Sequence, residues 1–299
     1  MGSFHAFESG KISLLFYLKM YISKNSYAKI NITLRVTGIR NDGYHNIFSL
    51  FSRINASERL HIRNSDKDCD IVNSPGMLIE GENIVAKALR IVREYGFNLP
   101  FLDISVYKTI PPGTGLGGGS GNAGAILDFI GAELPLDVVL KIGADVPFFY
   151  KNYEIAIISG IGGKIEPIDK LQLNIAIIVP KWNSVTKNAY KMLDMYWLPR
   201  GGYPLDENSA KNELYKIYSL LASNRFVGFL PNDFAPLLIE ENALYEKYFD
   251  IFYDSGALAW GITGSGASMF VLYSDKKVTP LLLDKIQAYE EFIDKVIIC

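Results

Sequence analysis

One glycine-rich stretch near the middle of the chain constrains the fold more than any other feature. Residues 111–123 read Pro-Pro-Gly-Thr-Gly-Leu-Gly-Gly-Gly-Ser-Gly-Asn-Ala. Glycine opens backbone conformations that are closed to other residues, and it lets N–H groups crowd around a ligand. Alternation over residues 101–107 predicts a half-buried strand before the loop, and the apolar run 122–130 predicts a buried helix after it. A glycine loop that opens a helix favours a cradle for a polyphosphate, because free N–H donors and the positive end of the helix dipole meet there.

Three other interpretations of this stretch compete with a phosphate cradle. Glycine-rich segments are often plain surface turns, although such a turn seldom joins a strand directly to an apolar helix. Gly113, Gly115 and Gly118 satisfy the G-x-G-x-x-G spacing of dinucleotide-binding loops. A dinucleotide-binding loop also requires an acidic residue at the end of a second strand about 20 residues later. Asp128 instead falls inside the predicted helix, which argues against this interpretation. A Walker A loop ends in Gly-Lys-Ser/Thr, and no lysine follows these glycines directly.

Charge and cysteine content narrow the class of ligand. The 299 residues include 30 basic and 32 acidic side chains with no dense basic run, which argues against a nucleic acid or an anionic membrane as a partner. No apolar run reaches the length of a membrane span. Cys69 and Cys299 form no C-x-x-C motif, and the three histidines are too scattered for a metal centre. We therefore expect a globular cytoplasmic protein that acts on a small molecule.

The first 19 residues are expected to be an N-terminal extension. Residues 12–18 form a short apolar patch that is faintly similar to a signal peptide, but no small-residue cleavage site follows it. Met20 is the expected native start of the chain.

A polar strand face near the start of the chain admits two interpretations. Residues 26–36 alternate and predict a strand whose even positions face the core. The odd positions then carry Lys29, Asn31 and Thr33 in a row. Such a face is usually solvated surface, and a functional role for Lys29 and Asn31 is the alternative.

Two further polar features are ambiguous on their own. The turn at 41–43 leads into Tyr44 and His45, which either clamp a planar base or form a structural pair at the turn. Asp145 lies between small and apolar residues. A carboxylate in such a place either bonds to the backbone structurally or acts in catalysis with a cationic partner.

The remaining periodicity predicts a mixture of helices and strands. Helices are expected over 82–95, 135–142, 209–221 and 236–253, and strands over 154–159, 163–168, 174–179, 257–260 and 268–273. Residues 261–267 form a second glycine-dense turn, for which a tight hairpin is the commoner structure.

Several stretches, in this order, resemble the GHMP small-molecule kinases. The likeness covers about residue 20 to the C-terminus, and its Asp-Gly-Tyr-His turn is specific for the branch that acts on a cytidyl ester of methylerythritol. The matching stretches are Ala-Lys-Ile-Asn at 28–31, Asp-Gly-Tyr-His at 42–45, the glycine loop at 115–123, Gly-Ala-Asp-Val-Pro at 143–147, Asn-Asp-Phe at 232–234 and Thr-Gly-Ser-Gly-Ala at 263–267.

This resemblance implies an α+β fold in two lobes. The N-terminal lobe, over 20–165, would be ribosomal-S5-domain-2-like, and the C-terminal lobe, over 166–299, would be ferredoxin-like, with ATP and substrate in the cleft between them. The implied reaction is the ATP- and Mg²⁺-dependent phosphorylation of the 2-hydroxyl of 4-diphosphocytidyl-2-C-methyl-D-erythritol, by a monomer or a weak homodimer.

The resemblance also implies roles for individual residues. Lys29 and Asp145 would form the catalytic pair, with Asp145 taking or orienting the proton of the attacking hydroxyl and Lys29 keeping the carboxylate ionised. Tyr44, Phe51 and Tyr190 would frame the cytosine ring and His45 would read its edge, while Asn31, Lys108 and Thr186 would lie near the substrate's phosphates or polyol. The implied ATP-binding residues are Pro111, Pro112, Gly113, Thr114, Gly115, Leu116, Gly117, Gly118, Gly119, Ser120 and Gly121, with Ser120 also at Mg²⁺.

The chain departs from the family pattern in three places. The family usually has Ser-Ser-Asn after its glycines, whereas this chain has Ser120-Gly121-Asn122, so one hydroxyl that could touch metal or phosphate is missing. Thr114 replaces a usual glycine, and the segment from the loop to Asp145 is shorter than usual. The rival functions are a GHMP kinase for a different alcohol and a nucleotide-binding protein without catalytic activity. The presence of both Lys29 and Asp145 argues against the second.

Overall fold

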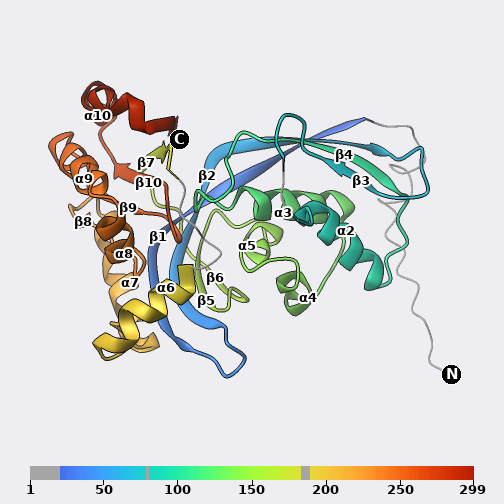
Figure 1. Ribbon diagram of the computed structural model, residues 1–299, viewed down its shortest axis with the longest axis horizontal. Helices are drawn as coiled ribbons and strands as arrows, with labels where there is room; N and C mark the ends of the chain where they lie inside the picture. The colour runs from blue at the N-terminus through green and yellow to red at the C-terminus, as the bar shows by residue number, and fades with distance from the viewer. Residues whose placement is uncertain (1–20, 79–80, 183–188) are drawn as a thin grey trace.

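The computed structural model describes residues 21–78, 81–182 and 189–299, and it is built on two β-sheets (Figure 1). The expected N-terminal extension and Met20 lie outside the described residues. The first sheet has the strand order β3-β4-β2-β5-β6, with β1 paired to β2. Its strands are β1 (Ile22–Ile39), β2 (His45–Asn64), β3 (Ile71–Asn73), β4 (Leu102–Tyr107), β5 (Ile155–Gly160) and β6 (Lys164–Pro167).

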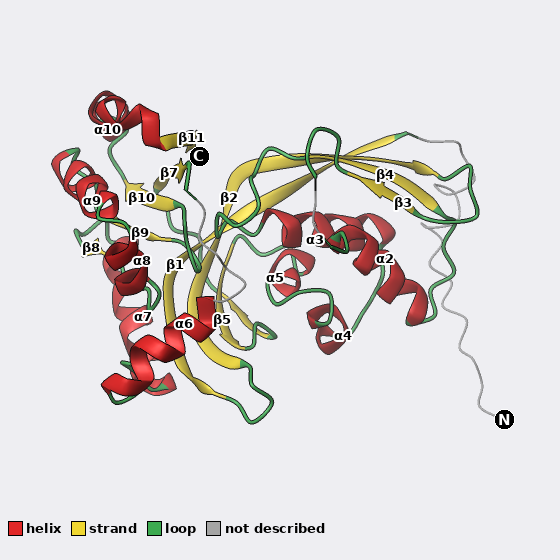
Figure 2. Ribbon diagram, in the orientation of Figure 1, coloured by secondary structure: helices red, strands yellow, loops and turns green. Residues whose placement is uncertain are grey.

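Strands β1 and β2 form a long antiparallel hairpin that carries half of the candidate site. The pairing runs from Ile39–His45 to Ile22–Ile62 and contains three register shifts, which bend both strands (Figure 2). The apolar even positions of β1 face the core, as expected. Its odd positions from Lys29 to Thr33 are buried as well. The alternative that this face is solvated surface is therefore wrong, because β1 is covered on both sides.

Helices α2 to α5 lie on one side of the first sheet, where α2 and α3 contact its strands and α4 packs on α5 (Figure 1). The helix expected over 82–95 is confirmed, with Asn83 capping it by accepting a hydrogen bond from the Val85 N–H at 2.9 Å. Helix α3 begins inside the glycine run, at Gly118, because Gly117 turns the chain into it with a φ of 68°. The helices are α2 (Ile84–Glu94), α3 (Gly118–Ile130), α4 (Leu136–Leu140) and α5 (Val146–Tyr150).

The second sheet has the order β11-β7-β10-β9-β8 and is flanked by the C-terminal helices (Figures 1 and 2). The single helix expected over 236–253 is wrong. The chain forms two helices there, because Asn242 leaves the helical conformation and its side chain accepts a hydrogen bond from the Leu244 N–H at 3.0 Å, where the second helix begins. The elements are β7 (Asn174–Pro180), β8 (Gly228–Phe229), β9 (Ala259–Ile262), β10 (Met269–Tyr273), β11 (Ile293–Ile298), α6 (Ala189–Trp197), η2 (Leu198–Arg200), α7 (Glu207–Ala222), α8 (Ala235–Glu241), α9 (Leu244–Asp254), α10 (Val278–Ile286) and η3 (Gln287–Phe292).

The two sheets pack against each other, and their mostly antiparallel strands with flanking helices confirm the expected α+β class. Leu34 of β1 pairs with Asn232 of the second half, and one hydrophobic cluster includes both Ile32 and Phe270. The chain passes from one sheet to the other over 168–173, and the expected lobe boundary at 165 lies within β6. Across the described part of the chain, no helix combines the length and hydropathy needed to cross a bilayer.

Candidate active site

Lys29 is the centre of the candidate active site. Its ammonium donates hydrogen bonds to Asn31 Oδ1 at 2.6 Å and to the Gly115 carbonyl at 3.0 Å, and it lies 3.4 Å from Asp145 Oδ2. It also lies over the ring of Phe51, 4.8 Å from the centroid. Three oxygen acceptors match the three N–H donors of a lysine. The buried charge is therefore fully partnered, with one partner in the glycine loop and one at Asp145.

Asp145 remains reachable from solvent, whereas Lys29 does not. The Asp145 side chain is 30% exposed and that of Lys29 is 4% exposed. The glycine loop lies directly on this ion pair. A Cβ at Gly117 would stand 3.0 Å from Lys29 Cε and 3.5 Å from Asp145 Oδ2. Glycine at this position lets the loop backbone approach both charges.

A cavity of about 610 Å³ lies along the glycine loop. Its wall includes the loop from Pro111 to Gly115, the first turn of α3 and the start of α2. The early N–H groups of α3 have no partner within the helix, so they are donors for an anion. Ser120 and Lys108 also line this cavity.

Gly121 faces away from that cavity. It lies on the side of α3 that packs against β1, where a Cβ would be 1.9 Å from the Tyr27 carbonyl oxygen. A side chain at position 121 would therefore clash with β1 in this structure. A hydroxyl at this position would point toward β1.

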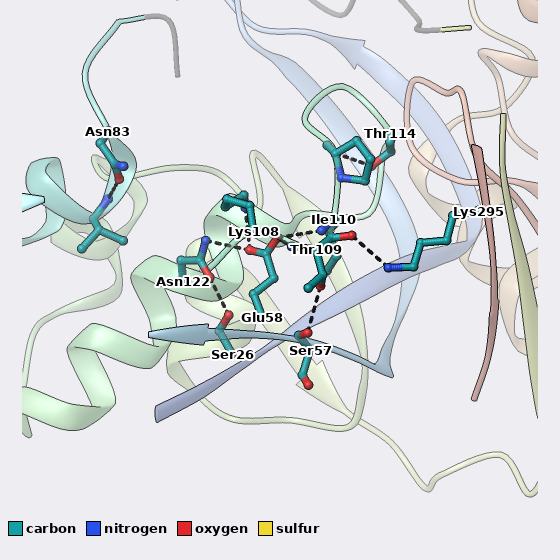
Figure 3. A network of polar contacts seen from close by, with 12 residues as sticks. Ser26, Ser57, Glu58, Asn83, Lys108, Thr109, Ile110, Thr114, Asn122 and Lys295 are labelled. Atoms are coloured by element: carbon teal, nitrogen blue, oxygen red, sulfur yellow. Dashed lines mark hydrogen bonds and ion pairs between the residues drawn. The ribbon is translucent and has the colours of Figure 1, made fainter. Parts of the chain in front are cut away.

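A second polar network holds the two ends of the glycine loop (Figure 3). Its centre is Glu58 of β2, whose side chain is completely buried. Glu58 Oε2 accepts from Lys108 Nζ at 2.5 Å and from Asn122 Nδ2 at 2.8 Å. Asn122 in turn accepts a hydrogen bond from Ser26 of β1.

The second glycine turn packs on the first. Thr263 Oγ1 accepts from the Asn31 N–H at 2.9 Å, and the Ser268 N–H donates to the Thr114 carbonyl at 3.2 Å. A Cβ at Gly115 would stand 2.2 Å from the Thr263 carbonyl oxygen, so the two backbones touch. The expected hairpin between β9 and β10 is present, and it also closes one side of the site.

His45 and Tyr190 lie against each other, and Tyr44 precedes His45 in the chain. Tyr44 is 63% exposed, and the rings of His45 and Tyr190 lie 4.6 Å apart at a 31° angle. His45 Nε2 lies 2.7 Å from Asp194 Oδ1, which also accepts a hydrogen bond from the Tyr203 hydroxyl. Burial of the Tyr190 hydroxyl end and the negative charge of Asp145 both raise the pKa of Tyr190, although part of its ring is exposed.

The structure separates some of the residues expected to act together. Phe51 is 1% exposed and packs edge-on against Phe148, so it lies in the core beneath Lys29 and away from the exposed ring of Tyr44. Lys108 lies in the glycine-loop cavity with its charge paired to Glu58. Thr186 lies outside the described residues.

Three residues of the site were missed from the sequence: Glu58, Asp194 and Thr263. The sequence did point to Glu58. Its neighbours two positions away on β2, Ala56 and Leu60, are apolar and face the core, so Glu58 faces the core as well and a carboxylate there must be paired. Asp194 lies four residues after Tyr190 and hence on the same helix face. Thr263 belongs to the Thr-Gly-Ser-Gly-Ala stretch that resembles the family, but no local pattern pointed to its contact with Asn31, which spans 232 residues.

The described residues offer no preformed metal site. Within 21–78, 81–182 and 189–299, no three His, Cys, Asp or Glu side chains converge. The Ser120 hydroxyl lines the cavity and lies 3.9 Å from the position that a Cβ at Gly143 would take. A hydroxyl at this place suits a Mg²⁺ ion that arrives with nucleotide phosphates, since Mg²⁺ usually takes few protein ligands.

Comparison with known proteins identifies relatives over most of the chain. The model of the GHMP kinases N terminal domain matches residues 83–152. The chain is 33% identical over 263 residues to the 4-diphosphocytidyl-2-C-methyl-D-erythritol kinase of Porphyromonas gingivalis, a match that covers 83% of this chain and 91% of that kinase. With the kinase of the same name from Parabacteroides distasonis it shares 32% identity over 260 residues, covering 82% and 89% of the two chains.

Solved structures show the same fold. A crystal structure of a 4-(cytidine 5'-diphospho)-2C-methyl-D-erythritol kinase superposes with a TM-score of 0.74 at 22% identity, covering 93% of this chain and 98% of that one. A homoserine kinase from Cytophaga hutchinsonii superposes with a TM-score of 0.62 at 17% identity, covering 95% and 96%. The two-lobed GHMP kinase fold expected from the resemblance is confirmed.

Proposed function

The chain belongs to the 4-diphosphocytidyl-2-C-methyl-D-erythritol kinases, a branch of the GHMP kinases, and from that premise we propose how its residues carry out the reaction. The reaction is the ATP-dependent phosphorylation of the 2-hydroxyl of 4-diphosphocytidyl-2-C-methyl-D-erythritol, in non-mevalonate isoprenoid biosynthesis. The observation that carries the proposed site is the Lys29–Asp145 ion pair, whose lysine also bonds to the glycine loop.

Asp145 and Lys29 prepare the attacking hydroxyl. Asp145 is the exposed member of the pair, so its carboxylate receives the substrate hydroxyl and orients or accepts its proton. The hydroxyl oxygen then bonds to the γ-phosphorus, the bond from that phosphorus to the bridging oxygen breaks, and ADP leaves. Lys29 fixes the Asp145 carboxylate and, through the Gly115 carbonyl, the loop beside the transferring group. Most of the rate enhancement then comes from positioning and electrostatics.

The glycine loop, residues 111–121, binds the phosphates of ATP. The free N–H groups at the start of α3 and the positive end of its dipole complement the negative charge. Ser120, which lines the cavity, would hold the Mg²⁺ ion of the bound nucleotide. Bound Mg²⁺ supplies charge neutralisation on the phosphate oxygens.

Tyr44, His45 and Tyr190 bind the cytidine end of the acceptor. Tyr44 offers an exposed ring for stacking, and Asp194 fixes the orientation of the His45 imidazole. Phe51 supports Lys29 from below, which replaces its expected role as a third ring around the base. Asn31 acts through Lys29, because its Oδ1 accepts from that ammonium.

The test is phosphoryl transfer from ATP to the cytidyl substrate, with a plain polyol and homoserine as alternative acceptors. We expect transfer to the cytidyl substrate alone, and a fall in kcat of about a thousandfold in Asp145→Asn. Asp137→Asn, an exposed aspartate on the neighbouring helix α4, is the matched control and should keep wild-type turnover.

Two outcomes would contradict this proposal in different ways. Full turnover by a folded Asp145→Asn variant would remove Asp145 from the mechanism. Transfer to homoserine or the polyol, with none to the cytidyl substrate, would assign the chain to another alcohol. ATP binding without transfer to any acceptor would favour a non-catalytic protein.

We also propose that the protein works in the cytoplasm as a monomer or weak homodimer, without nucleic acid or membrane as a partner. Support comes from the near balance of 30 basic and 32 acidic side chains and from Cys69 and Cys299, which are both free thiols.

A further inference from the structure

We propose that Glu58 is a positioning residue for ATP, which presets the glycine loop by fixing both of its ends and by holding Lys108. This inference rests on the proposed function only in taking the glycine-loop cavity as the ATP site. Glu58 does not face the cavity itself, and it is absent from every motif that carries the family resemblance.

Glu58 is a carboxylate with no exposure to water. Its side chain is 0% exposed, and that of Lys108 is 8% exposed. Taking a carboxylate out of water is costly, so a buried one persists only where donors saturate its oxygens. Glu58 has four donors: Oε2 accepts from Lys108 and Asn122, and Oε1 accepts from the N–H groups of Thr109 at 3.1 Å and Ile110 at 2.8 Å.

These donors lie immediately before and after the loop. Thr109 and Ile110 lead into Pro111, and Asn122 lies in the second turn of α3 (Figure 3). A Cβ at Gly118, the first residue of α3, would stand 3.5 Å from Glu58 Oε2. One side chain therefore fixes the entry, the exit and the distance between the two ends of the loop.

The entry of the loop has further supports, which all converge on Thr109. Its hydroxyl donates to the Ser57 carbonyl at 3.0 Å, and its carbonyl accepts from Lys295 Nζ at 3.2 Å (Figure 3). Ser57 adjoins Glu58 on β2, whereas Lys295 lies on β11 of the second sheet. Residues from both lobes thus bind Thr109, two residues before Pro111.

The pairing also decides what Lys108 does. Its ammonium lies 2.5 Å from the Glu58 carboxylate, so its charge is neutralised within the wall of the cavity. Lys108 then shapes the wall of the ATP site. The expectation that Lys108 contacts the acceptor's phosphates or polyol is replaced in this proposal by a role on the ATP side.

The change Glu58→Gln keeps the size of the side chain and removes its charge. If the remaining oxygen stays with the two backbone N–H groups, the new amide N–H₂ faces the donors of Lys108 and Asn122, and both bonds fail. Lys108 is left as a buried cation without its partner. We expect the affinity for ATP to fall about tenfold, because the loop no longer starts in its binding conformation.

The experiment measures binding of a non-hydrolysable ATP analogue by calorimetry and, separately, the Michaelis constants for both substrates. We expect Glu58→Gln to raise Kd and KM for the nucleotide about tenfold, while KM for the cytidyl substrate and kcat change by less than about twofold. Adding Lys108→Met to Glu58→Gln removes the unpaired cation and should restore part of the thermal stability but not the nucleotide affinity.

Asp70→Asn is the matched control. Asp70 pairs with Arg93 at 2.9 Å and accepts from the Leu102 N–H at 2.8 Å, so it is also a part-buried carboxylate holding a cation and a backbone group, away from the loop. It should lower Tm and leave nucleotide binding unchanged.

Equal effects of the Glu58 and Asp70 changes on nucleotide affinity would overturn the proposal, because the role of Glu58 would then be stability alone. If Glu58→Gln does not fold, Asn122→Ser replaces it in the experiment, because that change removes the hydrogen bond from α3 to Glu58. An unchanged affinity of Asn122→Ser for the ATP analogue would equally refute the proposal. Because analogue binding needs no acceptor, a tenfold loss of affinity would uphold the inference even if the cytidyl substrate were not phosphorylated.

Discussion

Restoring the serine that the family usually has at position 121 is expected to destabilise this protein. A Cβ at Gly121 would stand 1.9 Å from the Tyr27 carbonyl oxygen, whereas a carbon and an oxygen approach comfortably to about 3.3 Å. Helix α3 and strand β1 would have to separate by more than about 1 Å, in a region where Ser26 and Asn122 bond across the same contact. Overpacking of this kind costs about 3 kcal/mol, which lowers Tm by about 5 °C in a chain of this length.

The assay is thermal unfolding of Gly121→Ser followed by circular dichroism, with KM for ATP measured in parallel. Gly119→Ser is the matched control for stability, because a Cβ there would meet only the Ile84 methyl group at an ordinary 3.5 Å. We expect Gly119→Ser to change Tm by less than about 2 °C. A wild-type Tm for Gly121→Ser would refute the steric argument. A severalfold fall in its KM for ATP would show that the missing hydroxyl is a lost ligand.

Three further changes test other parts of the site and fold. Asp194→Asn removes the carboxylate that orients His45. KM for the cytidyl substrate should therefore rise about tenfold with kcat nearly unchanged. A fall in kcat alone, measured by steady-state kinetics, would contradict this expectation. Asn232→Ala leaves two buried carbonyls of the second glycine turn without their donor and should cost about 3 kcal/mol in denaturant unfolding, so an unchanged midpoint would argue against that contact. Hydrogen bonds from the backbone N–H and hydroxyl of Ser209 lower the pKa of Asp206 in the folded protein below its ordinary value of 3.8. The ionised Asp206 therefore stabilises the start of α7 fully above pH 3.8, and this stabilisation is lost as the pH falls through the pKa of the folded state. Asp206→Ala should therefore lower Tm near neutral pH, and the difference from wild type should shrink in acid; a constant difference would contradict the sign.

Local patterns in the sequence predict much of the fold. Period-two alternation identified β4 and the middle of β1, and helical spacing identified α2 and α7, because each buries one face with a regular repeat. The pattern failed where a side chain overrode it. Residues 236–253 are apolar at helical spacing throughout, yet Asn242 ends one helix and accepts a hydrogen bond where the next begins.

Motifs fixed the kind of chemistry but not the partners of each residue. The glycine run could be chosen from its composition, because few residue types allow a phosphate cradle, whereas Lys29 and Asp145 were chosen through the family resemblance. Local alternation could not decide whether Lys29 lies on the surface or in a functional site, because alternation indicates one buried face whereas both faces of β1 are buried.

The tertiary structure alone decided what surrounds those residues. Contacts such as Asn31 with Thr263 and Glu58 with Lys108 join segments far apart in the chain, and their geometry depends on how two lobes pack on one bent hairpin. The sequence by itself indicated the groups that we propose do the chemistry, because their residue types lie in short motifs that resemble those of the family. Only the packed fold determined that Gly121 faces β1, that Phe51 lies under Lys29 and that Glu58 holds the loop, because burial and close approach are properties of the whole chain.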